Sequence, residues 1–266
     1  MPKAATSRAV PDADPKPAVR TGGNADFEWD LFDPEAYVDH NYGTFRDDDR
    51  RIIQQVRDFF ATKAATLGPE TTGIDVGSGA NIYPALSMLP FCRGVTLWEY
   101  GLANVTWLKR EVRKFGPRWD PFWHVLQTRR SYRRVERPRD DLRRKAVVTK
   151  GDLFRLPRRQ WGMGTMFFVA ESMSDREREF NIAVERFIGS LTPGAPFAAA
   201  FMQDSTGYYV GPHRFPAVAV SKPDVEQCLA ASSDDLQVHE VRSAISLREG
   251  YHGMLLALGT VNSTRR

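Results

Sequence analysis

The stretch "TTGIDVGSGANIYPALSM", residues 71–88, contains the signal that decides the fold. A short apolar run ends at Asp75, a Gly-Ser-Gly sequence follows at 77–79, and helical spacing begins after it. Glycines at such a strand-to-helix turn let the backbone approach a ligand closely. Position 82 is Ile rather than the third glycine of the dinucleotide fingerprint, and no Gly-Lys-Ser/Thr of a P-loop follows. The stretch therefore predicts a ligand-binding loop of another kind, with a tight structural turn as the alternative.

The rest of the chain alternates between strand-like and helix-like patterns. Short apolar runs typical of buried strands are separated by amphipathic stretches of helical spacing. This alternation predicts a doubly wound α/β fold, with a mostly parallel seven-stranded sheet and helices on both faces. The last two strands have no helix between them, which indicates an antiparallel C-terminal hairpin. Strands are expected at 72–77, 94–100, 145–154, 165–173, 193–202, 236–244 and 250–261, and helices at 47–68, 81–90, 104–116, 175–191 and 221–233.

Length and composition set further limits. The 266 residues are enough for one large domain with a full core. The longest apolar runs are too short to cross a bilayer and no signal-peptide core follows Met1, so we expect a cytoplasmic protein without a membrane partner. Two cysteines without metal-ligand spacing predict neither a disulfide framework nor a metal site. Residues 1–25, rich in Ala, Pro, Asp, Lys and Gly, are expected to be a disordered tail.

Positive charge is concentrated in one segment. The net charge is +4, yet "TRRSYRRVERPRDDLRRK" at 128–145 holds eight Arg and one Lys against two Asp and one Glu, so the rest of the chain is slightly acidic. Interspersed acids and helical spacing favour a solvated helical face, and a phosphate-binding patch is the alternative. No nucleic-acid partner is expected, because Tyr132 is the only aromatic residue of the segment.

Acidic residues stand at the ends of three successive strands. They are Asp75, Glu99 and Asp152, and ligands of parallel sheets bind at these strand ends. A carboxylate after the second strand is placed to accept both hydroxyls of a ribose, and one after the third can meet an adenine amino group. Each acid alone is also typical of a helix cap or a turn. The three together favour a ligand that carries both groups.

Longer motifs resemble one known family. These are "FDPEAYVDHNY" (32–42), "IDVGSGANIYPALS" (74–87), "VTLWEYGLAN" (95–104) and "RWDPFWHVL" (118–126), and the similarity extends over about 30–260. They look like the nicotinamide, phenylethanolamine and indolethylamine (thioether) N-methyltransferases. The resemblance implies a class I, Rossmann-like methyltransferase that uses S-adenosylmethionine (SAM) and releases S-adenosylhomocysteine (SAH). It also implies an N-terminal helical lid over 26–70, followed by the methyltransferase domain over 71–266.

The same resemblance implies which residues hold the cofactor. Tyr37 and Tyr42 would lie on the lid, against the methionine portion and carboxylate of SAM. Glu99 stands where the family usually has Asp and would hold the ribose, while Asp152 would meet the adenine. The complete set of implied cofactor residues is Tyr37, Tyr42, Asp75, Gly77, Ser78, Gly79, Tyr83, Glu99, Tyr100, Asn104, Asp152, Leu153 and Val169.

The acceptor side matches the family less well. Glu171 in "FFVAESMSD" corresponds to the family's substrate-side acid, although an acid at a helix start is the alternative interpretation. The second family acid is missing, because position 202 is Met, and Asp204 is the nearest carboxylate. The expected catalytic residues are Glu171, Tyr37 and Asp204. The expected substrate contacts are Glu171, Asp204, Tyr209 and Glu249.

Methyl transfer from a sulfonium requires mainly positioning and a dry site, and an amine acceptor must lose its proton. The sequence therefore predicts SAM-dependent transfer of a methyl group to a nitrogen of a small molecule, by a monomer or weak homo-oligomer. The altered acids keep transfer to oxygen, carbon or sulfur as the alternative.

Overall fold

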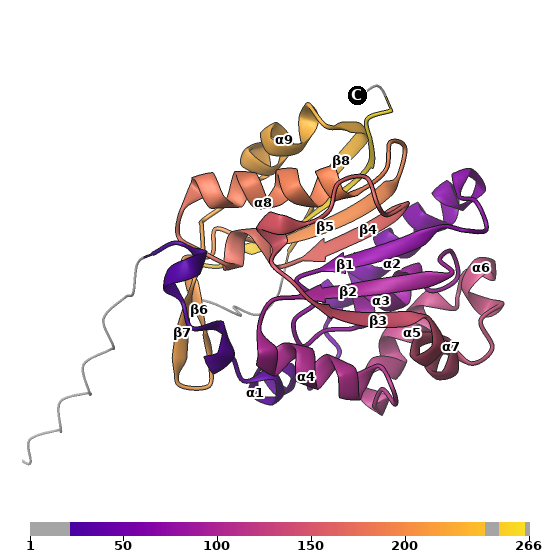
Figure 1. The fold of residues 1–266 in the computed structure, drawn as a ribbon, viewed down its shortest axis with the longest axis horizontal. Helices are drawn as coiled ribbons and strands as arrows, with labels where there is room; N and C mark the ends of the chain where they lie inside the picture. Colours follow the sequence, from indigo (N-terminus) through magenta and orange to yellow (C-terminus); the bar gives the residue numbers. More distant parts are fainter. Residues whose placement is uncertain (1–21, 243–249, 264–266) are drawn as a thin grey trace, which may run out of the picture.

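A computed structural model describes residues 22–242 and 250–263. A central sheet has the strand order β3-β2-β1-β4-β5-β9-β8 (Figure 1). The first five strands pair in parallel, whereas β9 is antiparallel to both neighbours. The seven strands are β1 (Thr72–Val76), β2 (Gly94–Glu99), β3 (Ala146–Lys150), β4 (Met163–Phe167), β5 (Pro196–Gln203), β8 (Ser233–Val241) and β9 (Gly253–Val261). The predicted doubly wound sheet and its C-terminal antiparallel pair are confirmed.

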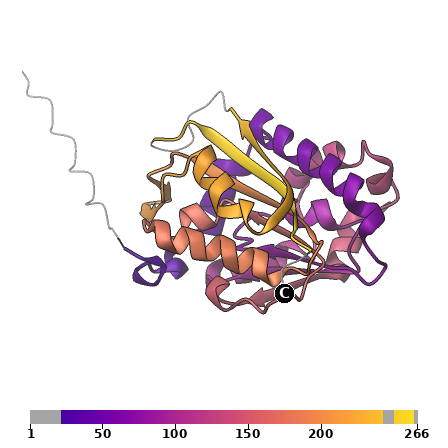
Figure 2. The same ribbon diagram turned by 90° about the horizontal axis from the view of Figure 1, so that it is seen from above.

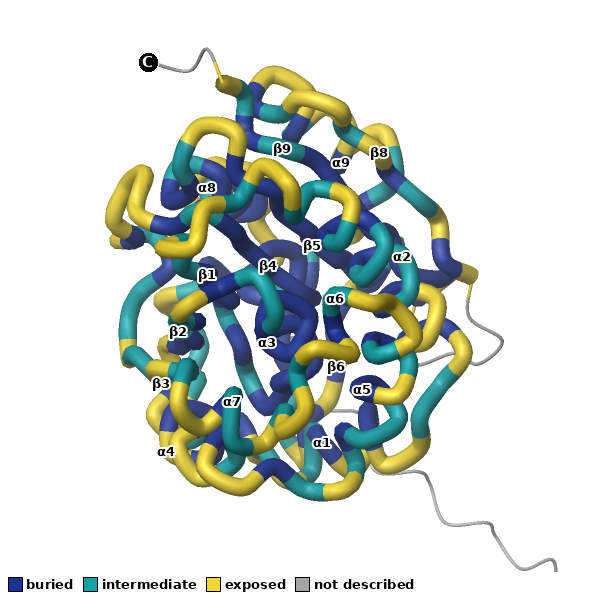
Figure 3. The backbone as a smooth tube through the Cα atoms, turned by 90° about the vertical axis from the view of Figure 1, so that its right-hand side faces the viewer, coloured by how far each residue is buried: buried dark blue, intermediate teal, exposed yellow. Residues whose placement is uncertain are grey.

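Helices cover both faces of the sheet, and Figure 2 shows the two layers from above. One apolar cluster joins the sheet to α2, α3, α4 and α5, and a second joins it to α8 and α9. The central strands β1, β4 and β5 are buried between these layers (Figure 3). The helices are α1 (Pro34–Tyr42), α2 (Asp47–Lys63), α3 (Tyr83–Met88), α4 (Leu102–Glu111), α5 (Asp120–Leu126), α6 (Arg130–Arg133), α7 (Pro138–Lys145), α8 (Glu177–Ser190) and α9 (Lys222–Ala230). None of the helices in the described part of the chain is both long and apolar enough to span a bilayer.

The expected lid divides into two parts with different surroundings. Helix α2 buries Ile52, Ile53, Val56 and Phe60 completely in the core against the sheet. Each such side chain contributes about 1.5–3 kcal/mol of burial free energy, which holds α2 firmly in the sheet domain. Only the segment before α2 lies over the ligand edge of the sheet. It contains α1 and two 3-10 turns, η1 (Asn24–Asp26) and η2 (Trp29–Leu31).

The end of the expected disordered tail is ordered in the structure. The N–H of Gly22 donates to Asp175 Oδ2 at 3.0 Å, and the N–H of Asn24 donates to Glu179 Oε2 at 2.7 Å. These acids lie at the start of α8, so residues 22–25 are attached to the sheet domain. Residues 1–21 of the expected tail lie outside the described residues.

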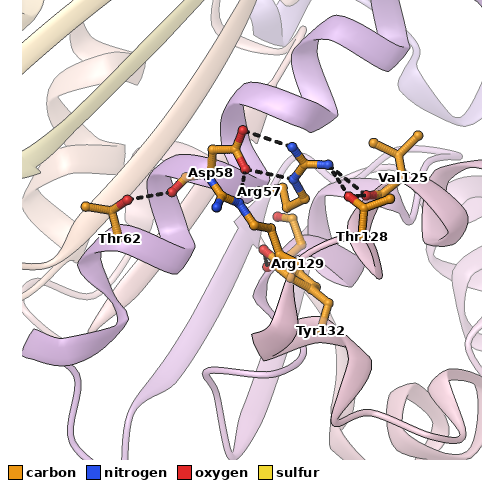
Figure 4. A network of polar contacts seen from close by, with 8 residues as sticks. Arg57, Asp58, Thr62, Val125, Thr128, Arg129 and Tyr132 are labelled. Carbon is orange, nitrogen blue, oxygen red and sulfur yellow. Dashed lines mark hydrogen bonds and ion pairs between the residues drawn. The ribbon is translucent and has the colours of Figure 1, made fainter.

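The basic segment is helical and anchored by a polar network (Figure 4). Arg57 of α2 donates through Nε and Nη2 to Asp58 and through Nη1 to the Val125 carbonyl and Thr128. Arg129 also donates to Asp58, at 2.6 Å. Burial would raise the pKa of Asp58, but hydrogen bonds from Arg57 and Arg129 outweigh it and lower that pKa. The network therefore fastens the segment to α2, and the expected solvated helical face agrees with its exposed arginines.

A second, two-stranded sheet was not predicted. Strands β6 (Gly207–Val210) and β7 (His213–Pro216) form a hairpin beside the N-terminal segment (Figure 1). A small aromatic cluster joins them, in which Trp29 stacks on Phe215 with ring centroids 5.3 Å apart. The hairpin and the N-terminal segment thus form one covering unit.

Candidate active site

A cavity lies at the carboxyl ends of the parallel strands, where the strand order changes direction between β1 and β4. Doubly wound sheets bind their ligands at this point. The space between its walls, open solvent included, amounts to about 860 Å³.

The glycine turn forms one wall of the cavity. Gly77 and Gly79 have φ values of +63° and +56°, the left-handed region that glycine adopts without strain. A Cβ on Gly77 would lie 2.5 Å from Val169 Cγ1, so no larger residue fits there. Ser78 between them also lines the cavity, and its hydroxyl donates to the carbonyl oxygen of Asp75 at 3.0 Å. The sequence thus folds into a cradle of bare backbone.

Glu99, at the end of β2, closes this cradle. Its Oε2 accepts the N–H of Gly79 and its Oε1 accepts the N–H of Gly101, both at 2.8 Å. Burial raises the pKa of Glu99, while these two hydrogen bonds and one from the Asn104 side chain oppose the rise. Asn104 lines the cavity, and its Oδ1 has no hydrogen-bond partner in the described part of the chain. An acceptor atom is therefore available to a ligand beside the carboxylate.

The end of β3 supplies the next wall. Asp152 and Leu153 line the cavity, and the carboxylate of Asp152 accepts the N–H of Phe154 at 2.9 Å as the cap of a 3-10 turn. Tyr100 lines the mouth with half of its surface exposed. These residues occupy the edge on which the sequence predicts adenine contacts.

Three of the expected cofactor residues lie behind the wall rather than on it. Asp75 is 1% exposed, and its Oδ1 accepts the hydroxyl of Thr165 at 2.7 Å. Burial raises the pKa of Asp75 to about 7, against the effect of that hydrogen bond. Tyr42 and Tyr83 are buried in the aromatic core, and Tyr42 Oη accepts from the side chain of Asn81, a lining residue. Asp75, Tyr42 and Tyr83 therefore do not line the space that a ligand in the cavity would occupy.

The N-terminal segment covers the cavity with aromatic side chains. Tyr37 lines it as expected, but Trp29, Phe32 and Asn24 also line it and were not predicted. Trp29 is held by its own Nε1, which donates to the Asn24 carbonyl at 3.0 Å. The aromatic residues of "FEWDLFD" (27–33) were the available signal, but they indicated only where order begins.

The expected acceptor residue Glu171 lies behind the cavity wall in this structure. Its side chain is fully buried, and Oε1 accepts the N–H of Met202 and the hydroxyl of Ser172, both at 3.0 Å. The short turn η6 (Ala170–Ser172) rotates Glu171 into the protein, so Ser172 and Met173 face the cavity instead. The carboxylate thus braces the turn against β5.

The other expected acceptor residues are also displaced. Asp204 does not line the cavity, and its carboxylate lies 3.1 Å from Nδ1 of His252 in a largely exposed pair. Tyr209 is 48% exposed, whereas its neighbour Tyr208 lines the cavity and donates to the Ser172 carbonyl at 3.2 Å. Alternate residues of a strand face opposite sides, so Tyr208 and not Tyr209 faces the cavity. Glu249 lies outside the described residues.

The wall beyond β4 is apolar. Phe167 and Phe168 line it together with Met173. Phe168 has φ of +61°, a conformation that costs a non-glycine residue about 1–3 kcal/mol and commonly occurs at functional sites. Its N–H donates to the Ala200 carbonyl at 2.7 Å, which holds this backbone in place. The cavity therefore has a polar half at the ends of β1, β2 and β3, and an aromatic half between the end of β4 and the covering unit.

The strand order and the glycine–acid cradle define a Rossmann-like domain that binds its ligand at the carboxyl ends of the parallel strands. The NNMT/PNMT/TEMT family profile matches residues 23–255, and the chain belongs to this family. It is accordingly a SAM-dependent methyltransferase, as the sequence predicts.

Solved structures share the fold at low identity. One is the N-methyltransferase NodS from Bradyrhizobium japonicum WM9, in complex with SAH, with a TM-score of 0.52 and 11% sequence identity. The alignment covers 81% of this chain and 88% of the NodS chain. Another is magnesium protoporphyrin IX methyltransferase from Synechocystis PCC 6803, with bound SAM, with a TM-score of 0.52 and 10% sequence identity. The alignment covers 84% of this chain and 89% of that methyltransferase chain. No curated protein sequence matches the chain.

Proposed function

We propose that the protein transfers the methyl group of SAM to a nitrogen of a flat, aromatic small molecule. The observation that carries this proposal is a single cavity with two chemically different halves. Its polar half offers a glycine cradle and carboxylates, and its other half is walled by aromatic rings and Met173. Membership of the NNMT/PNMT/TEMT family supports nitrogen as the acceptor atom.

The residues of the polar half fit SAM. The left-handed Gly77 and Gly79 leave room for backbone contact with a ligand chain. Two residues that line the cavity, Asn104 and Trp98, each have a buried polar atom (Oδ1 and Nε1) without a hydrogen-bond partner among the residues described. A ribose hydroxyl would supply the donor that Asn104 lacks, beside the carboxylate of Glu99. Asp152 and Leu153 would hold the adenine, and Tyr37 would cover the methionine portion.

The aromatic half indicates what kind of acceptor fits. The only carboxylates that line the described cavity are Glu99 and Asp152, and both lie at the ends of β2 and β3, in the polar half. An aliphatic amine is protonated near neutral pH and needs a nearby base before it can attack. A ring nitrogen with a free lone pair needs none. Phe167, Phe168 and Tyr208 offer flat surfaces on which such a ring can stack.

The chain contributes positioning and exclusion of water. Bound SAM supplies an electrophilic methyl group on its sulfonium. Trp29 and Phe32 close the cavity over the acceptor, and the strained backbone of Phe168 fixes one wall. A methylated ring nitrogen carries positive charge, which aromatic faces stabilise by about 0.5–2 kcal/mol each. Preorganised walls of this kind lower the barrier without a covalent intermediate.

An acceptor screen tests this proposal. The protein is incubated with SAM and three panels of compounds (N-heterocycles, aliphatic amines, and phenols or thiols), and the methylated atom is located by NMR. Turnover on N-heterocycles, reduced at least tenfold by Tyr208→Ala in kcat/KM, is the expected result. Turnover confined to phenols, thiols or carbon acceptors would contradict the nitrogen assignment and leave the SAM-dependent methyltransferase class intact.

A further inference from the structure

A buried carboxyl group without an ion pair lies beneath the cavity. Asp49, in the first turn of α2, is 3% exposed and forms no ion pair with any residue of the described ranges. Its backbone N–H donates to Oδ1 of Asp48 at 2.8 Å. An isolated buried carboxylate is costly, so such a group is neutral, compensated by hydrogen bonds or retained for a function.

The start of a helix does not by itself account for this carboxyl group. The dipole of α2 favours an acid in its first turn by about 0.3–1 kcal/mol. Asp47 already provides one there, exposed and paired with Arg51 at 2.7 Å. Asp49 instead faces the hydroxyl of Tyr83, which is fully buried and has no partner of regular hydrogen-bond geometry among the described residues. The carboxyl therefore belongs to a polar cluster inside the core.

This cluster connects Asp49 to the cavity wall. The hydroxyl of Tyr42 accepts from Asn81 Nδ2 at 3.0 Å and is also hydrogen bonded to Tyr37. Asn81 and Tyr37 both line the cavity. The rings of Tyr42 and Tyr83 meet edge to face, with centroids 5.9 Å apart. Burial raises the pKa of both phenols, so their hydroxyls stay protonated and act as donors.

We propose that Asp49 is a positioning residue of the SAM site, which orients the hydroxyls of Tyr83 and Tyr42 and through them the lining side chains Asn81 and Tyr37. The inference rests on the proposed function, because it takes the carboxylate end of SAM as the group that these side chains meet. With Asp49 neutral, the two phenol hydroxyls support Asn81 and Tyr37, the side chains that would meet that anion. An ionised Asp49 attracts the phenol hydrogens away from these side chains and repels the anion.

Proton linkage follows from this arrangement. The groups that face Asp49 are Asp48 and Arg46 beside it, Tyr83 from α3 and Tyr42 from α1. Burial, then repulsion from Asp48, raises the pKa of Asp49 to about 7. An anion bound near it raises that pKa further. Binding of SAH therefore takes up a proton, at most roughly 0.8 per site at pH 7.5, and the Kd rises above pH 7.

Calorimetric titration of the full-length protein with SAH measures both quantities. Titrations in two buffers of different ionisation enthalpy give the proton uptake, and titrations from pH 6 to 8.5 give the Kd profile. The wild-type Kd is expected to rise with pH, with a limit of roughly 30-fold over this range. Asp49→Asn, which keeps the shape and removes the titration, is expected to flatten the profile and lower the uptake. Asp47→Asn is the matched control, because that carboxyl stands in the same first turn of α2 but is exposed and paired with Arg51.

The outcomes separate the inference from the proposed function. If the wild type does not bind SAH, the proposed function fails. If it binds but its Kd and uptake do not change with pH, or if Asp49→Asn reproduces the wild-type profile, Asp49 has no positioning role. Should Asp49→Asn not fold, Tyr83→Phe replaces it, because it keeps the ring stacked on Phe122 and removes only the hydroxyl. An unchanged wild-type profile in Tyr83→Phe would equally overturn the inference.

Discussion

Two glycines with the same φ angle provide a sharp test of the cradle. Gly79 and Gly211 both have φ of +56°, and a Cβ on either would meet nothing closer than 3.8 Å. An alanine in this conformation costs roughly 1–2 kcal/mol at each position. Gly79 lines the cavity, whereas Gly211 lies in the turn between β6 and β7. Gly79→Ala and Gly211→Ala should therefore be destabilised alike but differ in ligand binding.

The expected magnitudes follow from the contacts. A cost of this size lowers Tm by about 2–8 °C in a domain of this length, for both variants. The added methyl group at Gly79 occupies space in the cavity, so the Kd for SAH should rise at least tenfold, about 1.4 kcal/mol. Gly211→Ala should bind as the wild type does. Thermal unfolding, monitored by circular dichroism, measures the Tm. Calorimetric titration below the unfolding transition measures the Kd for SAH. Equal SAH affinity in the two variants would refute the placement of the ligand on the cradle.

The remaining predictions concern the acceptor side, the anchored basic segment and pH. Tyr208→Ala should raise the KM for the acceptor at least fivefold, and Tyr209→Ala should leave it unchanged, because only Tyr208 of the two lines the cavity. Steady-state kinetics of the two variants test this prediction. Equal effects on KM would contradict the observed register of β6. Arg57→Ala should lower the free energy of unfolding by about 1–3 kcal/mol in urea titrations, because it leaves several partners unbonded, whereas exposed Arg130→Ala should change it by less than about 0.5 kcal/mol. The pKa of Asp75 is raised from 3.8 to about 7 in the folded protein, so the folded state binds more protons than the unfolded state and the free energy of unfolding falls as pH rises between about 4 and 7. Asp75→Asn should flatten this part of the plot of stability against pH. An unchanged slope would contradict the raised pKa of Asp75.

Local spacing made the polar half of the cavity predictable. The cradle of Gly77–Gly79 and the acids Glu99 and Asp152 are each fixed by a strand end, and strand ends are visible in the apolar pattern. The seven-stranded sheet was predictable for the same reason. Tertiary packing decided the rest. Burial of Asp49 depends on how α2 meets α3, which no periodicity within α2 reveals.

The aromatic half of the cavity depended on register, which a sequence pattern leaves open by one residue. Glu171 and Tyr209 each have a neighbour, Ser172 and Tyr208, that lines the cavity in their place. A shift of one position turns a side chain from the cavity to the opposite side. The hairpin of β6 and β7 had a usable signal in the Gly211-Pro212 dipeptide, which is typical of a turn.

The most direct test of the central claim is calorimetric titration of the wild type and Glu99→Ala with SAH. Glu99 joins the glycine turn to the end of β2 through Gly79 and Gly101, so its carboxylate is the centre of the proposed cofactor site. Saturable one-site binding by the wild type, weakened at least tenfold in a folded Glu99→Ala, is the predicted result. Absence of binding by the wild type, or equal affinity in both proteins, would contradict the account.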